Sequence, residues 1–219
     1  MIRLFEGGMV INFDIRSLAI ALSIALIGLT VTLFGLWKSN VSRTGTGYWV
    51  FGMLFSMIAF GLLGARDLLP PFLSIFLANL LISIGFTMFL RGVRIFSRRK
   101  PLTVLDICVT FLVALGFWYF TFVNFNVAAR VVVITSSVSL VSLIAAVNLL
   151  QSRNTAWKVA AFYASIVFSF NCAFMILRII VTLRKEGMSS FMSAGNFHSL
   201  TFLVLILFYV GITFSFIWL

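Results

Sequence analysis

The chain has 219 residues, of which 62% are hydrophobic and 10% are charged. Soluble domains are typically about 45–50% apolar and about 25% charged, so the composition excludes an ordinary water-soluble domain. The net charge of +11 comes from basic residues in short connections between apolar runs. That pattern favours membrane lipids as partners and argues against nucleic acid.

The chain begins with a short segment that carries Arg3, Glu6 and Asp14. A long apolar run follows, with no small-residue cleavage site after it, so we expect the first helix to be retained rather than removed as a signal peptide. We predict a periplasmic segment over residues 1–14 and a single domain of seven membrane-spanning helices over residues 15–219.

Seven apolar runs are long enough to cross a bilayer core, which needs about 20 helical residues. They predict an all-α polytopic membrane protein, a seven-helix bundle, because the period-two alternation of a β-barrel is absent. The prolines Pro70, Pro71 and Pro101 stand at helix starts, where a missing N–H costs nothing. The expected spans are residues 15–37, 48–64, 71–96, 102–122, 127–150, 157–183 and 197–219.

The basic residues predict the orientation. The dense cluster from Arg91 to Lys100 is typical of a cytoplasmic connection, so we expect the N-terminus outside and the C-terminus inside a bacterial inner membrane. Tryptophans near span ends suggest aromatic belts at the two interfaces. We place Trp37, Trp49, Trp157 and Trp218 in the inner belt and Trp118 in the outer one.

Small and hydroxyl-bearing residues predict which spans face the protein interior, since close packing drives helix association in lipid. They favour the second, third and fifth spans, and we expect most of the hydroxyls only to pack. The residues are Gly52, Ala59, Gly61 and Gly64; Ser74, Ala78, Gly85 and Gly92 beside Asn79, Ser83, Thr87 and Arg91; and Thr135, Ser136, Ser137, Ser139 and Ser142.

Polar side chains within spans are the candidate functional residues, because an arginine at a span centre costs about 2.5–3.5 kcal/mol on insertion scales. We hypothesise a pocket, open to the periplasm, that binds a small polar or anionic ligand. Its candidate residues are Arg66, Arg130, Asn171, Arg178, His198 and Asn79. The alternative is that Arg66 pairs with Asp67 or extends to the interface, Arg130 contacts headgroups and Arg178 caps helix carbonyls.

The sequence carries no catalytic or metal-binding motif. It has no P-loop, Ser/His/Asp set, HExxH or paired acids, and its single histidine cannot form a bis-imidazole haem site. We therefore expect no enzyme activity, no cofactor and no metal. Cys108 and Cys172 should lie at different depths and stay unpaired, and Asp106 should pair with a cytoplasmic basic residue.

One stretch of the chain carries a recognisable pattern. Gly47, Tyr48 and Trp49 open the second span and Arg66 closes it; Leu69-Pro70, Ser74-Ile75, Ala78-Asn79, Arg91-Gly92 and Phe96 follow, with Arg130 and Arg178 further on. This pattern resembles the N-terminal multi-helix membrane module of bacterial diguanylate cyclases, whose cytoplasmic catalytic domain carries the GGDEF motif. The resemblance implies a sensor that regulates cyclic di-GMP synthesis, and a homodimer, because the reaction joins two GTP molecules.

In that family the last membrane helix leads into a cytoplasmic signalling helix and then the cyclase. No GGDEF sequence occurs in these residues. We expect either a sensor module without its catalytic domain or a stand-alone relative.

Two other classes share the seven-span topology. A small transporter or ligand-binding membrane protein is the alternative, although transporters usually show internal repeats and broken helices, and the sequence shows neither. A retinal photoreceptor is excluded, because no lysine for a Schiff base lies between Phe197 and Leu219.

Overall fold

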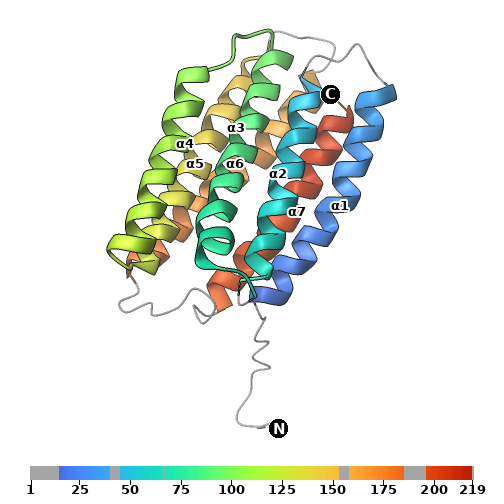
Figure 1. Ribbon diagram of the computed structural model, residues 1–219. Helices are drawn as coiled ribbons and strands as arrows, with labels where there is room; N and C mark the ends of the chain where they lie inside the picture. Colours follow the sequence, from blue (N-terminus) through green and yellow to red (C-terminus); the bar gives the residue numbers. More distant parts are fainter. Residues whose placement is uncertain (1–14, 40–44, 67, 153–157, 185–195, 219) are drawn as a thin grey trace, which may run out of the picture.

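The computed structural model describes residues 15–39, 45–66, 68–152, 158–184 and 196–218, the first three residues of the last range by backbone alone (Figure 1). The described residues are all-helical, and their seven long helices are apolar enough to cross a membrane. The prediction of seven spans is confirmed, with ends shifted by at most a few residues. The helices are α1 (Ile15–Ser39), α2 (Thr46–Gly64), α3 (Ala78–Phe96), α4 (Thr103–Trp118), α5 (Val127–Leu150), α6 (Lys158–Arg184) and α7 (Asn196–Trp218).

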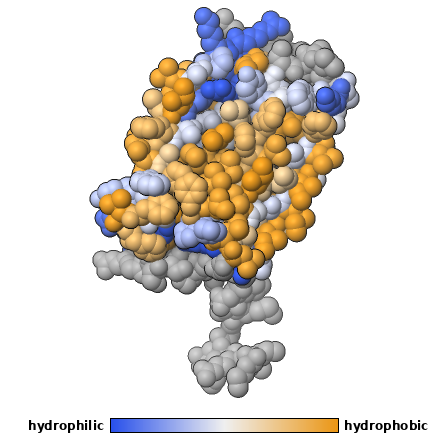
Figure 2. Space-filling model, viewed as in Figure 1, coloured by the Kyte–Doolittle hydropathy of each residue, from blue (hydrophilic) through white to orange (hydrophobic). Residues whose placement is uncertain are grey.

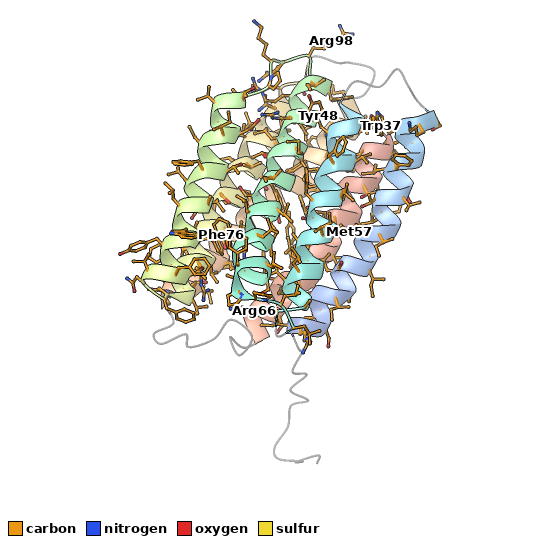
Figure 3. All side chains as sticks on the ribbon, in the orientation of Figure 1. Trp37, Tyr48, Met57, Arg66, Phe76 and Arg98 are labelled. Atoms are coloured by element: carbon orange, nitrogen blue, oxygen red, sulfur yellow. The ribbon has the colours of Figure 1, made fainter. Side chains whose placement is uncertain are left out.

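Two π-helical turns extend these helices. The turn η1 (Phe72–Leu77) precedes α3, and η2 (Tyr119–Val123) follows α4. Both lie at the end of the bundle that also holds Arg66, whereas Arg98 lies at the opposite end (Figures 1 and 3). We call these the Arg66 end and the Arg98 end. An apolar belt covers the visible face between them, and hydrophilic residues gather at the Arg98 end (Figure 2).

Six of the helices form a closed ring. Around it, α1 packs on α2, α2 on α3, α3 on α5, α5 on α6, α6 on α7, and α7 again on α1. Helix α4 packs outside the ring against α3 and α5, and it exposes Phe111, Leu112 and Leu115 on its outer face. The first and the last helices are therefore neighbours.

The most buried spans are those of α2, α3, α5 and α7. The first three agree with the pattern of small and hydroxyl-bearing residues. That pattern missed α7, whose inward face is aromatic: Phe202, Phe208, Tyr209 and Phe216 are each at most 3% exposed. Within α5, Ser136 is exposed and does not contribute to the interior face of that span.

Glycines let α2 and α3 approach closely. A Cβ added to Gly52 would lie 2.6 Å from the Phe89 ring, and one added to Gly92 would overlap the Trp49 indole. Gly45 has a φ of +105°, which only glycine adopts easily, and its Cβ would lie 2.6 Å from the Gly92 carbonyl oxygen. Gly52, Gly85 and Gly92 therefore form a contact surface between α2 and α3. The predicted Gly61 and Gly64 instead face α1.

The space beside Gly92 holds Trp49, which is 1% exposed and stacks on Phe216 of α7 at a centroid distance of 3.9 Å. Placing Trp49 in a lipid-facing aromatic belt is therefore wrong. Trp118 and Trp218 are exposed, as expected for belt residues, and Trp157 lies outside the described residues.

Most described hydroxyls bond within their own helix. Ser56 donates to Gly52 O at 2.8 Å and Thr135 donates to Val131 O at 2.6 Å, for example. An exception is Ser23, which donates to Met57 O of the neighbouring helix at 3.0 Å. Most of these hydroxyl groups thus form their hydrogen bonds within their own helix, and shape complementarity supplies much of the interhelical packing. The cysteines are unpaired as predicted, Cys108 exposed and Cys172 buried.

At the Arg98 end, a polar network joins α3 to α4 and α5. Arg91 Nε donates to Asp106 Oδ2 at 2.5 Å, which confirms the predicted pairing of Asp106 with a basic residue. The Asn148 side chain accepts hydrogen bonds from Arg94 and Arg99, both at 3.0 Å. Charge-assisted bonds of this kind fix the helix ends relative to one another.

Candidate functional site: an arginine-lined cavity

A cavity opens within the ring at the Arg66 end, and every helix except α1 contributes to its wall. The wall has a polar group and a larger apolar group. The polar group consists of Arg66, Asn79, Arg130, Thr135, Arg178 and Thr201. The apolar group consists of Phe60, Leu63, Ile75, Ile82, Phe86, Phe117, Val127, Val131, Ile134, Val138, Met175, Phe202 and Leu205.

The cavity is narrow and follows the helix axes. The volume open to the centres of water-sized spheres is about 80 Å³. This is roughly half of the volume of about 150 Å³ in which an apolar cavity accommodates benzene, so the space suits a small ligand. Along α5 the wall runs from Val127 to Val138, which is roughly 16 Å at a rise of 1.5 Å per residue. The cavity therefore reaches from the Arg66 end toward the middle of the bundle.

Arg130 is positioned by the start of α5. Asn126 caps this helix, its Oδ1 accepting a hydrogen bond from Ala129 N at 2.9 Å, which places Arg130 in the first turn. The Arg130 side chain is 4% exposed, and neither Nη1 nor Nη2 has a hydrogen-bond partner among the described residues. The guanidinium carbon lies 4.6 Å from the centroid of the Phe125 ring, a cation–π contact that compensates part of the burial.

Two more arginines line the same cavity. Arg178 comes from α6, is 7% exposed, and lies about one and a half turns before the end of that helix. Arg66 follows α2 at the mouth of the cavity and is half-buried (Figure 3). Within the described part of the chain the one acidic residue is Asp106, which pairs with Arg91 at the far end. The described wall thus carries positive charge without a carboxylate.

Asn79 lines the cavity from the first turn of α3. Its Nδ2 donates to Ile75 O in η1 at 2.7 Å, so the amide is held against the π-helical turn. Ser74 in the same turn donates to Pro70 O at 3.2 Å. Short π-helical segments occur often at functional sites, where they redirect side chains. Here η1 sets where Asn79 and Ile75 meet the cavity.

The structure brings together four of the six predicted site residues: Arg66, Asn79, Arg130 and Arg178. Asn171 does not line the cavity; it is fully buried two turns from Arg178 and donates to Ser142 Oγ at 2.9 Å. The side chain of His198 lies outside the described residues, and so does Asp67, the predicted partner of Arg66.

Sequence reasoning missed the apolar depth of the cavity. Below the arginines the wall is formed by residues such as Ile82, Phe86 and Val138, and the Thr135 hydroxyl is already bonded to Val131 O. No local signal separates these apolar residues from their neighbours on the same helices. Their role depends on how the helices of the ring are placed.

The arrangement suits binding better than metal chemistry. Among the described residues no group of three or more His, Cys, Asp or Glu side chains could hold a metal ion. Guanidinium groups are fork-shaped donors that match carboxylates and phosphates. The cavity can therefore receive a small anion at its arginines and apolar atoms beyond them.

The fold and the cavity define a class of protein, an all-helical bundle with seven candidate membrane spans around an arginine-lined pocket. Comparison with protein-family models finds no match. Comparisons with curated proteins and with solved structures find none either.

Proposed function

We propose that this protein is a sensory membrane module that binds a small anionic ligand in the arginine-lined cavity. The observation that carries the proposal is the Arg130 guanidinium, buried at the cavity wall with two nitrogens that no described residue accepts from. A buried charge is costly unless it is paired, and ionisable groups within membrane spans are functional candidates by default. An anion bound at Arg130 supplies the acceptors, and Arg178 lines the same cavity.

Aromatic packing supports a route from the cavity to the far end of α7. Phe86, in the cavity wall, stacks on Phe208 of α7 with the ring centroids 5.5 Å apart. Phe216 lies eight residues, or roughly 12 Å, further along α7 and stacks on Trp49 of α2. A ligand that moves Phe86 or its helix therefore displaces the contacts that hold the Arg98 end of α7.

Signalling requires two arrangements of the helices that bind the ligand with different affinity. In one arrangement the arginines converge on the anion; in the other their mutual repulsion separates the helices that carry them. The ligand favours the first arrangement by its differential affinity. The position of α7 at the Arg98 end differs between the two arrangements, and this difference is the signal.

The orientation and the output follow from the basic cluster and from the family resemblance. With the Arg98 end in the cytoplasm of a bacterial inner membrane, the cavity faces the periplasm and α7 leads toward the cytoplasm. The output is a diguanylate cyclase domain, and the module acts as a homodimer. The resemblance of residues 45–96 to the sensor modules of diguanylate cyclases supports this assignment.

A cyclase fusion tests the proposal. A diguanylate cyclase catalytic domain is joined after Leu219, and cyclic di-GMP is measured while acetate, butyrate or inorganic phosphate is added outside. We expect at least one anion to change the output about fivefold or more, the lower range of typical allosteric coupling. Arg178→Gln should remove the response, and the exposed control Arg98→Gln should keep it. Output that no anion changes contradicts the proposal.

Uptake measurements separate sensing from transport. The described helices have their π-helical turns at the Arg66 end rather than at mid-span, so they lack the broken helices typical of transporters. We expect purified protein in liposomes to bind the responding anion without accumulating it in the lumen. Protein-dependent uptake would instead identify the transporter.

A further inference from the structure

The change from charged to apolar wall residues along the depth of the cavity narrows the ligand class further than the charge of the wall alone does. The charged groups lie near the Arg66 end: Arg130 is three residues from the start of α5, and Arg178 is six residues from the end of α6. Deeper in, the wall is apolar, as at Ile82, Phe86 and Val138. A fully hydrated inorganic anion would leave this deeper half without matching groups.

The size of the cavity limits the apolar part. The volume is about 80 Å³, whereas an apolar cavity of about 150 Å³ accommodates benzene, so the apolar part of the ligand is limited to a few carbons.

We infer that the cavity selects a small carboxylate with a compact apolar body, its carboxylate at Arg130 and Arg178 and its carbons against Ile82, Phe86 and Val138. This inference rests on the proposed function and names the ligand class for the same site. The Arg130 guanidinium is a fork-shaped donor that matches a carboxylate, and the single negative charge keeps the desolvation cost lower than that of a phosphate dianion.

The test compares ligands of one series on the full chain in nanodiscs of zwitterionic lipid, with empty nanodiscs subtracted for partitioning into the bilayer. Affinity is measured by titration calorimetry for acetate, propionate, butyrate and hexanoate, and for 1-butanol and inorganic phosphate. We expect the affinity to rise about fourfold with each methylene, or about fifteenfold from acetate to butyrate. 1-Butanol and phosphate should bind at least tenfold more weakly than butyrate.

Variants at the deep end make the test specific to this cavity. Val138→Phe fills the space beyond the arginines, so butyrate should bind at least tenfold more weakly while acetate changes by less than twofold. Val138→Ala enlarges the same space and keeps the test informative even if Val138→Phe does not fold. It should lengthen the carboxylate that binds most tightly by one or two carbons. Val147→Phe, at an exposed position on the same helix, is the control and should change neither affinity.

A lipid headgroup could present the same anionic chemistry, so one arm replaces the zwitterionic lipid with phosphatidylglycerol. Butyrate affinity should fall by no more than about threefold relative to zwitterionic lipid. A negative surface potential of about 30 mV lowers the anion concentration at the membrane by about that factor. Loss of butyrate binding there assigns the site to the lipid and overturns the inference.

The remaining outcomes separate the two proposals. If acetate or phosphate binds as tightly as butyrate, the inference is wrong and anion sensing stands. If no anion binds to the unmodified protein, the proposed function fails and the inference fails with it.

Discussion

The Arg130 side chain is buried and incompletely hydrogen-bonded, and both properties lower the stability of the folded protein. Its guanidinium is 4% exposed, and two of its nitrogens lack acceptors among the described residues. Replacing buried charged groups with hydrophobic residues of similar volume is often stabilising, whereas the proposed anion binding requires the charge to stay. Without an anion, Arg130 should therefore impose an unfavourable free energy that a bound anion releases.

Replacing Arg130 with methionine should stabilise the anion-free protein. An unsatisfied buried donor costs about 1–3 kcal/mol, and each kcal/mol shifts Tm by about 2–4 °C in a chain of this size. We expect Arg130→Met to raise the apparent Tm in anion-free detergent by roughly 2–12 °C and to abolish butyrate binding. Arg98→Met, at an exposed turn, should change stability by less than about 0.5 kcal/mol. A lower Tm for Arg130→Met would show that the charge is already paired.

Between elements, the α2–α3 contact depends on glycines that bring the two helices together. Gly92 leaves room for Trp49, whose indole in turn stacks on Phe216 of α7. The contact thus joins three helices at the Arg98 end. An added methyl group has nowhere to go, because the Gly45 carbonyl oxygen would lie 3.0 Å from it on the other side.

Gly92→Ala should destabilise the bundle by about 1–3 kcal/mol, the usual range for overpacking a well-filled core. Thermal unfolding in detergent measures it, together with the near-ultraviolet circular dichroism of the aromatic side chains. The matched control is Gly28→Ala on α1, where an added Cβ meets nothing within 4 Å. That control should be neutral or slightly stabilising, because alanine favours helix. Equal changes in the free energy of unfolding for Gly92→Ala and Gly28→Ala would contradict the close α2–α3 contact.

The helices themselves were predictable from the sequence because length and hydropathy decide them. The sequence also grouped Arg66, Arg130 and Arg178 near one end of the bundle. It could not place Trp49, whose burial depends on a glycine 43 positions away on another helix. Nor could it select Phe86 and Val138 as cavity wall, because lipid-facing and cavity-facing apolar residues look alike until the helices are placed side by side.

For the whole molecule, the orientation in the membrane is the prediction on which the proposed sensory function depends. The Arg98 end carries the dense basic cluster, so it should face the cytoplasm. Arg98→Cys and Leu68→Cys place single thiols at the two ends in a background where Cys108 and Cys172 are serine. Both positions are exposed.

A membrane-impermeant maleimide should label the Leu68→Cys protein in intact cells and the Arg98→Cys protein only after lysis. The reverse pattern would put the cavity in the cytoplasm and exclude a periplasmic ligand. Equal labelling of both thiols in intact cells would indicate mixed insertion.

The adjacency of α1 and α7 has a consequence for biosynthesis. Of the seven helices, α7 leaves the ribosome last, so the ring cannot close until the insertion machinery releases it. Before that moment Thr201, Phe202 and Leu205 are missing from the cavity wall. Arg130 and Arg178 must then face hydrocarbon or the translocon, at a cost of several kcal/mol. A nascent chain that stalls before α7 should therefore be a substrate for membrane quality-control proteases.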